Sequence, residues 1–316
     1  MVSPGTARLS AKRAFLERLI DDAGLFPPAS LDMAAALRGD ARARTGPHSW
    51  MLGRFVVPAG RLADLACVLG ESGMGPLAVS AIVDGGHAAR DIARVAEFAL
   101  GATAALDVEA LEIRLPDRPD GDVRRAVLRV VADVDAGGLG RSVAGYLEFS
   151  FGADWRSHVA TVLDAIADAR ARSAHPIAAK IRCGGLTAQS VPSGEQLAFA
   201  IGTLRALGIP WKATAGLHHP VRAHVPAAGF TMHGFLNVIG AAILDAALDL
   251  DARTRERILA EDGERAFRLD DDGFAWRDLR ADGVQVASAR RSAVHAFGSC
   301  SFEEPVADLE ALGILT

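Results

Sequence analysis

The sequence predicts an α/β protein folded as a (β/α)8 TIM barrel. Segments that resemble strands alternate with amphipathic helical segments, and each pair takes about 30 residues, the length of one βα unit. Such alternation is typical of a parallel sheet with right-handed crossovers. We expect one domain, 1–316, with an N-terminal helical segment at 1–50 and an enlarged insertion at 217–293. An open doubly wound sheet is the alternative.

The predicted strands are short runs rich in apolar residues, at 52–58, 77–84, 110–115, 144–151, 176–182, 210–215 and 295–299. Between them, apolar residues recur at spacings of three and four, which predicts helices at 60–71, 87–100, 121–136, 155–173 and 193–207. A candidate for the eighth strand is 266–277, although Asp270-Asp-Asp-Gly273 within it is also typical of a hairpin turn.

Strict alternation of side chains favours the closed barrel. Apolar and polar residues alternate in Leu111-Glu-Ile-Arg-Leu115, Tyr146-Leu-Glu-Phe-Ser150 and Ala179-Lys-Ile-Arg182, so each strand has one apolar and one polar face. Strands of a sheet covered on both sides would be apolar almost throughout. A barrel packs its apolar face against helices and lines its upper interior with polar groups. An antiparallel sheet with one wet face explains the same pattern, but the long helical connections argue against it.

The composition indicates a cytoplasmic protein that acts on a small molecule. A net charge of −5 and a pI near 6.0 give no basic surface for nucleic acid. Three cysteines are too few for a disulfide framework and fit a reducing compartment. The longest apolar stretch, 235–248, is too short to span a membrane. It predicts a buried helix or a subunit interface, so a homo-oligomer is one expectation.

Lysine is rare in this chain and therefore informative. The three lysines are Lys12, Lys180 and Lys212, against 31 arginines among the 34 basic residues. Arginine keeps its proton at any usable pH, whereas a buried lysine can lose it and act as a nucleophile or base. Two of the lysines lie in strand-like runs that end in glycine. The residues that a barrel would direct inwards are Arg54, Ser80, Glu112, Arg114, Tyr146, Glu148, Lys180, Arg182, Lys212 and Thr214.

These residues suggest imine chemistry on a small anionic carbonyl compound. Repulsion between neighbouring ammonium groups would lower the pKa of one lysine, which activates it for Schiff-base formation. We expect one of Lys180 and Lys212 to form the imine and the other to depress its pKa, while Glu148 or His218 moves protons. The expected substrate-binding residues include Arg54, Glu112, Arg114 and Arg182, with no cofactor. In the alternative, both lysines only form ion pairs with Glu112 and Glu148.

Two lysine motifs resemble those of the class I deoxyribose-phosphate aldolase type of barrel. Lys180-Ile-Arg-Cys-Gly184 and Lys212-Ala-Thr-Ala-Gly216 are similar to that family's motifs in spacing and position, although Arg182 and Cys183 replace small hydroxyl residues. The resemblance implies a carbon–carbon lyase in which Lys180 is the Schiff-base residue and Lys212 its pKa-lowering neighbour. Ala110-Leu-Glu112-Ile is faintly similar to the strand that carries the family's acid/base aspartate.

A late turn resembles the family's phosphate-holding turn. Phe297-Gly-Ser299-Cys-Ser301 is similar to its Gly-Thr-Ser-Ser sequence. The resemblance implies that Gly298, Ser299 and Ser301 contact the substrate's phosphate.

Histidines provide a competing prediction. His218-His219-Pro220 follows the Lys212 strand, and His233 lies just before the next predicted helix. His218 and His233 could hold a divalent metal together with an acidic strand residue, as in metal-dependent lyases and hydrolases. The acidic candidates are Glu112, Glu148 and Asp84. A third prediction is a barrel that binds a phosphorylated metabolite without catalysis.

Overall fold

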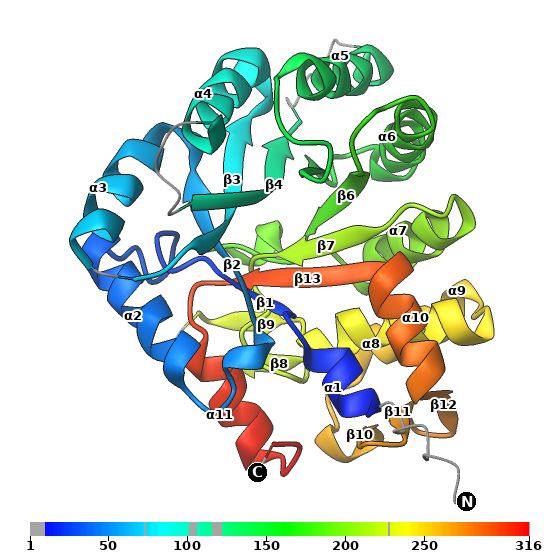
Figure 1. The fold of residues 1–316 in the computed structure, drawn as a ribbon. Coiled ribbons are helices and arrows are strands. Elements are labelled where there is room, and N and C mark those ends of the chain that lie inside the picture. Colours follow the sequence, from blue (N-terminus) through cyan, green and yellow to red (C-terminus); the bar gives the residue numbers. More distant parts are fainter. Residues whose placement is uncertain (1–9, 73, 101–105, 116–121, 227, 316) are drawn as a thin grey trace, which may run out of the picture.

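The protein folds around a closed barrel of parallel strands (Figure 1). The computed structural model describes residues 10–72, 74–100, 106–115, 122–226 and 228–315. Around the barrel the strand order is β1-β13-β7-β6-β5-β4-β3-β2. The barrel strands are β1 (Ile20–Asp22), β2 (Leu52–Pro58), β3 (Leu77–Asp84), β4 (Leu106–Arg114), β5 (Ala144–Phe149), β6 (Ile177–Arg182), β7 (Trp211–Thr214) and β13 (Val294–Ser299). The predicted (β/α)8 architecture is confirmed, and the open and antiparallel sheets are excluded.

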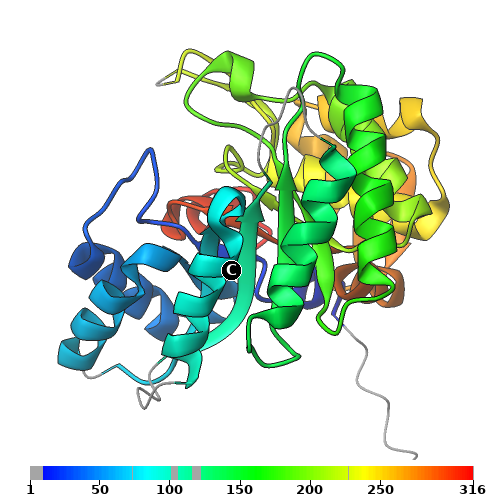
Figure 2. The ribbon, with the colours of Figure 1, turned by 90° about the horizontal axis from the view of Figure 1, so that it is seen from above.

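Helices cover the outside of the barrel (Figures 1 and 2). They are α1 (Ala11–Leu16), α2 (Met33–Thr45), α3 (Leu62–Ser72), α4 (Ala88–Leu100), α5 (Val123–Ala136), α6 (Trp155–Arg170), α7 (Gly194–Ala206), α8 (Phe235–Leu248), α9 (Ala252–Ala260), α10 (Gly283–Ser292) and α11 (Glu303–Ala311). Several begin at a side-chain cap: Ser193, for example, accepts a hydrogen bond from the amide of Gln196, which satisfies a free N–H group of the first turn. None of the helices in the described ranges is long and apolar enough to cross a membrane.

The eighth barrel strand is not where the sequence suggested. The candidate region, 266–277, contributes to a separate antiparallel sheet of β10 (Phe267–Leu269), β11 (Gly273–Trp276) and β12 (Leu279–Asp282). Its Asp270–Gly273 segment forms the hairpin turn that was the other interpretation. The barrel closes instead through β1, which pairs with β13 and β2. The segment 1–50 is therefore not purely helical, because it contains a barrel strand.

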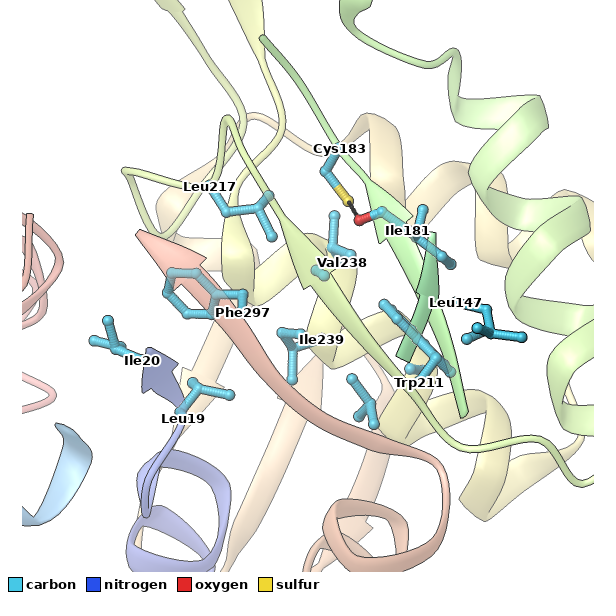
Figure 3. Close-up of a cluster of buried hydrophobic side chains, with 14 of the residues drawn as sticks. Leu19, Ile20, Leu147, Ile181, Cys183, Trp211, Leu217, Val238, Ile239 and Phe297 are labelled. Atoms are coloured by element: carbon cyan, nitrogen blue, oxygen red, sulfur yellow. Dashed lines mark hydrogen bonds between the residues drawn. The ribbon is translucent and has the colours of Figure 1, made fainter. Parts of the chain in front are cut away.

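The enlarged region 217–293 packs against the outside of β7 and β13. It holds a small hairpin of β8 (Ala223–Val225) and β9 (Phe230–Met232), followed by α8, α9, the antiparallel sheet and α10. Helix α8 is buried along nearly its whole length, as its apolar sequence predicted. Its Val238 and Ile239 lie among Trp211, Leu217 and Phe297 (Figure 3). These contacts bury the apolar faces of β7 and β13 and leave their polar faces inside the barrel.

Two glycines let the carboxyl ends of β6 and β7 come together. A Cβ atom placed on Gly184 would lie 2.8 Å from the Cα of Gly216, and the reverse distance is the same. Gly216 also has a φ of +73°, which side chains other than glycine rarely adopt. The glycine that ends each lysine motif therefore has a steric reason, namely the close approach of two backbones directly beyond Lys180 and Lys212.

Candidate functional site

The two barrel lysines lie side by side inside the barrel. Lys180 on β6 and Lys212 on β7 are direct partners in the strand register. Their side chains are only 4% and 1% exposed. Burial of two ammonium groups requires charged or polar partners, because desolvation of an unpaired charge costs several kcal/mol.

Three carboxylates supply those partners. Glu112 lies between the lysines, with Oε2 2.7 Å from Nζ of Lys180 and Oε1 2.6 Å from Nζ of Lys212. Glu148 Oε2 is 2.7 Å from Lys180, and Asp21 Oδ2 is 2.5 Å from Lys212. Neither β4 nor β1 is a neighbour of β7 in the strand order. The contacts of Lys212 with Glu112 and Asp21 therefore cross the barrel interior.

Charges of alternating sign continue in both directions from this centre. We call the whole series the charge chain; in order from the mouth it is Arg182, Glu148, Lys180, Glu112, Lys212, Asp21, Arg54, Glu109 and Arg18. Each member lies within 4.0 Å of the next, the longest step being 3.9 Å between Asp21 and Arg54. The side chains at its two ends, Arg182 and Arg18, are 45% and 51% exposed.

The partners keep Glu112 and Lys212 ionised. Burial alone would raise the pKa of Glu112, but the ammonium groups of Lys180 and Lys212 outweigh it and hold that pKa well below its usual range. Burial alone would lower the pKa of Lys212, but Asp21 and Glu112 raise it. Lys212 is therefore not the lysine whose pKa is lowered, and Glu112 offsets the expected repulsion between the two ammonium groups. Lys180 pairs with Glu112 and Glu148, as the alternative prediction had it. Lys212 also pairs with Glu112, but its second partner is Asp21 and not Glu148.

The lower end of the charge chain depends on an irregularity in β4. The β3–β4 register shifts by one residue after Val108, which leaves Glu109 as an extra residue. Bulges of this kind re-aim a side chain. Glu109 meets the guanidinium of Arg54 at 2.9 Å and that of Arg18 at 2.6 Å. Arg54, which we expected at the substrate, thus forms ion pairs with protein carboxylates near the start of β2.

Asp21 is held from two sides by β2. The backbone N–H of Arg54 donates to Asp21 Oδ1 at 2.7 Å. A Cβ atom on Gly53 would lie 2.2 Å from the same oxygen, so glycine makes room for the carboxylate. Together these contacts fix Asp21 in the direction of Lys212.

Tyr146 lies beside Lys212 inside the barrel. We call Lys180 and Lys212 together the lysine layer. The ring of Tyr146 is 5.7 Å from Nζ of Lys212, and its hydroxyl is 2.8 Å from Nδ1 of His295 on β13. Burial and nearby arginines lower the pKa of His295 to about 4. Tyr146 packs with Ala110 and Ala178 in a small apolar cluster apart from the main core. The lysine layer thus has apolar contacts within the barrel as well as charged ones.

Two of the expected substrate-binding arginines stand at the mouth. Arg182 is the last residue of β6, and its Nε lies 3.1 Å from Glu148 Oε1. Burial would raise the pKa of Glu148, but Lys180 and Arg182 lower it overall. Arg114 ends β4 and is level with Glu148 in the register.

The late turn is held by the backbone around it. Gly298 is level with Asp21 and Thr214 in the register. Ser299 is buried, and its carbonyl oxygen accepts a hydrogen bond from the amide of Ala23 at 2.7 Å. The hydroxyl of Ser301 accepts from the amide of Glu304 at 3.1 Å, at the start of α11. The turn thus lies at the mouth, and Ser301 already has a role in capping α11.

The histidines do not meet one another. His218 Nδ1 lies 2.8 Å from Glu304 of α11, and its ring is 3.9 Å from the thiol of Cys300. His233 Nε2 lies 2.7 Å from the carbonyl of Pro192. Across the described residues, no group of three or more His, Cys, Asp and Glu side chains could hold a metal ion. The metal prediction therefore gains no support from the geometry.

Three members of the charge chain, Asp21, Glu109 and Arg18, escaped sequence reasoning. Asp21 lies in a strand of three residues, too short to show an alternation. Glu109 faces the interior only because of the bulge. The one available signal was Leu19-Ile20 followed by two aspartates before a turn. Cys183, which directly follows Arg182, is buried, and burial raises the pKa of its thiol to about 12.

Comparisons with known proteins do not identify the chain. No protein-family model matches it, and a search of curated proteins finds no match.

Proposed function

We propose that this protein is a lyase of the aldolase type, which makes or breaks a carbon–carbon bond in a small carbonyl compound through an imine on Lys180. The observation that carries the proposal is the enclosed pair of lysines bridged by Glu112. Arginine forms buried ion pairs without losing its proton. Lysine at both positions, in a chain with 31 arginines, favours a role that needs a releasable proton.

Lys180 is the better nucleophile of the two. Lys212 stays an ammonium because Asp21 and Glu112 raise its pKa. Along the charge chain Lys180 lies two steps nearer the mouth than Lys212, and it contacts Glu148, which leads to the half-exposed Arg182. In the proposal, Lys180 passes a proton to Glu148, and its free amine attacks the carbonyl carbon of the substrate. Glu148 then returns the proton to the departing hydroxyl group, and loss of water gives the iminium ion.

The charge chain stays balanced through these steps. An iminium nitrogen carries the same single positive charge as the ammonium it replaces, so Glu112 and Glu148 keep a cation between them. The iminium accepts the electron pair of the breaking carbon–carbon bond, while a carboxylate takes the proton from the β-hydroxyl group. The aldehyde half leaves, the remaining enamine takes up a proton at carbon, and water hydrolyses the resulting imine to free Lys180.

The charge balance also indicates where the substrate carries a negative charge. Around the reacting centre, Lys180 and Lys212 each already have carboxylate partners. The carbonyl end of the substrate therefore needs no negative charge. An anionic group, such as a phosphate or carboxylate, would lie further out, beside Arg182, Arg114 and the turn at Gly298 and Ser299.

Borohydride trapping tests the proposal. The purified protein is incubated with small aldehydes and ketones, and borohydride reduces any imine that forms. The mass of the intact protein is then measured by mass spectrometry before peptide mapping. We expect one covalent adduct, on Lys180. Because the chain has three lysines, mapping distinguishes all of them.

Three variants serve as comparisons. Lys180→Arg keeps the charge but cannot form an imine, so the adduct should disappear. Lys12→Arg is the matched control, because the side chain of Lys12 donates to the carbonyl of Ile314 at 3.0 Å and the change should not affect trapping. Glu148→Gln should slow trapping by roughly the 10²-fold that a positioned acid/base group contributes. An adduct on Lys12, or none with any carbonyl compound, would refute the imine mechanism.

A further inference from the structure

A thiol, an imidazole and a carboxylate from three separate segments meet at the rim of the barrel. Cys300 directly follows β13, His218 follows β7, and Glu304 lies in the first turn of α11. The Sγ atom of Cys300 lies 3.9 Å from both ring nitrogens of His218. His218 Nδ1 also lies 2.8 Å from Glu304 Oε2. None of the three belongs to the charge chain, and the proposed lyase chemistry does not use the thiol.

The electrostatics of this cluster favour a protonated imidazole. The pKa of His218 is raised to about 9, first by its hydrogen bond with Cys300 and further by Glu304, while burial opposes the rise. The imidazole therefore carries a proton at neutral pH. A thiol next to a protonated histidine is the arrangement that produces a nucleophilic thiolate.

The two other thiols lack this environment. Cys67 is exposed on α3, and its Sγ lies 4.0 Å from the carboxylate of Glu71. Cys183 is buried, with its thiol directed at the carbonyl of Ile181 (Figure 3). Exposure alone would make Cys67 the most reactive of the three, whereas the electrostatic argument selects Cys300, which is half-buried.

We propose that Cys300 is a reversible modification site that exchanges with small disulfides of the glutathione type. The thiolate of Cys300 attacks one sulfur of the disulfide, a new S–S bond forms, and the old one breaks. The departing thiolate takes the proton from His218 and leaves as a thiol. Cys300 is oxidised to the mixed disulfide, half of the reagent is reduced, and excess thiol reverses the reaction.

The position of Cys300 determines where a group attached to its thiol would lie. Gly298, two residues earlier, is level with Asp21, the partner of Lys212. A group attached at Cys300 therefore stands at the mouth, above the lysine layer.

Thiol-exchange kinetics on the full-length protein test the proposal. Dithiodipyridine is added at neutral pH, the released thiopyridone is followed by absorbance, and peptide mapping assigns each phase. We expect Cys300 to react about tenfold or more faster than Cys67, and Cys183 to react only after unfolding. Cys300→Ser should remove the fast phase and leave the Cys67 phase unchanged. Oxidised glutathione should then add to Cys300 first.

Neighbouring histidines provide a matched pair of variants. His218→Gln should slow Cys300 by about tenfold. His219→Gln should not, because His219 pairs with Asp308 of the same helix at 2.7 Å and does not contact the thiol in any described interaction. The Cys67 rate in each variant reports whether the fold is intact. If Cys300 is no faster than Cys67, or if both histidine variants slow it equally, the proposal is wrong. These rates do not depend on imine formation, which borohydride trapping measures separately.

Discussion

Among the ionic clusters buried in the described part of the protein, two are built from different cations. Inside the barrel, Lys180 and Lys212 carry the positive charge. In the helical layer outside, the fully buried Asp245 of α8 is held by Arg255 of α9 at 2.8 Å and by Arg205 of α7 at 3.1 Å. Both clusters satisfy the same requirement, because a buried charge needs a partner of opposite sign.

The choice of cation separates a supporting role from a chemical one. The guanidinium of Arg255 also donates to the carbonyls of Ala198 and Leu250, so one rigid fork joins three segments. Arginine suits that task because it is planar and always charged. The barrel lysines each contact two carboxylates and no backbone carbonyl in any described hydrogen bond. These contacts neutralise the charges of the two lysines. Unlike the contacts of Arg255, they do not tie a side chain to the backbone of another segment.

The largest expected effect comes from removing the shared carboxylate of the barrel cluster. Glu112→Gln leaves both lysines short of one counter-ion and turns an amide N–H₂ towards an ammonium group. We expect a loss of about 3–5 kcal/mol in the free energy of unfolding, measured by urea denaturation. The Ser80 hydroxyl, 2.7 Å from Glu112, keeps an acceptor in the variant.

The pH dependence of this loss distinguishes lysine from arginine. Without Glu112, burial lowers the pKa of Lys212 with only Asp21 opposing it. A cation whose folded pKa lies below its unfolded pKa binds fewer protons when folded, so stability rises with pH. The deficit of Glu112→Gln should therefore shrink between about pH 7 and pH 10. A deficit that stays constant would mean that the lysines hold their protons as arginines do.

Asp245→Asn is the corresponding change in the helical cluster. We expect a smaller loss, about 2–3 kcal/mol, because Arg255 keeps its two backbone acceptors. The deficit should not vary with pH over the same range, since the guanidinium stays protonated. Parallel urea titrations of both variants test the comparison directly, and a pH-dependent deficit here would contradict it.

The sequence predicted the barrel lysines because a strand has a period of two. Once Leu147 and Ile181 are assigned to the helix-covered face, Glu148 and Lys180 must face the interior, and seven strands were placed within a few residues by this reasoning. Pairing across the interior does not follow from periodicity. Whether Lys212 meets Asp21 or Glu148 depends on how the closed barrel is staggered, and sequence alternation does not specify that.

Short and irregular elements were beyond the same reasoning. Strand β1 has three residues, fewer than the four to eight over which alternation is read. The bulge at Glu109 reverses the face that alternation assigns. His218 and His219 both pair with carboxylates of α11. This helix follows β13 and is far from the two histidines in the sequence. Such contacts between distant segments need coordinates.

Asp22 extends the comparison to a buried carboxylate that forms no ion pair with any cation among the described residues. Its side chain accepts from the amide of Gly24, while the nearby Arg44 forms its ion pair with Asp40. Burial raises the pKa of Asp22 to about 7. Its folded pKa exceeds the unfolded value, so the folded state binds more protons and stability falls as pH rises from about 4 to about 7.

Asp22→Asn should remove this dependence. We expect the variant to be more stable than the natural protein by about 1–2 kcal/mol above pH 7, with a smaller difference at pH 5. Thermal or urea unfolding at the two pH values measures it. An equal difference at both would show that Asp22 titrates alike in the folded and unfolded states.

The smallest expected effect tests whether burial beside a carboxylate is enough to make a lysine reactive. Arg255→Lys places an amine next to Asp245 but loses the fork to Ala198 and Leu250, at a cost of about 1 kcal/mol. The new lysine lies in the helical layer, away from the mouth, so we expect borohydride trapping to leave it unmodified while Lys180 still reacts. An adduct at position 255 would mean that a paired, buried amine suffices for imine formation. The reactivity of Lys180 would then follow from its being a lysine, and the presence of Lys212 and Glu112 beside it would need another explanation.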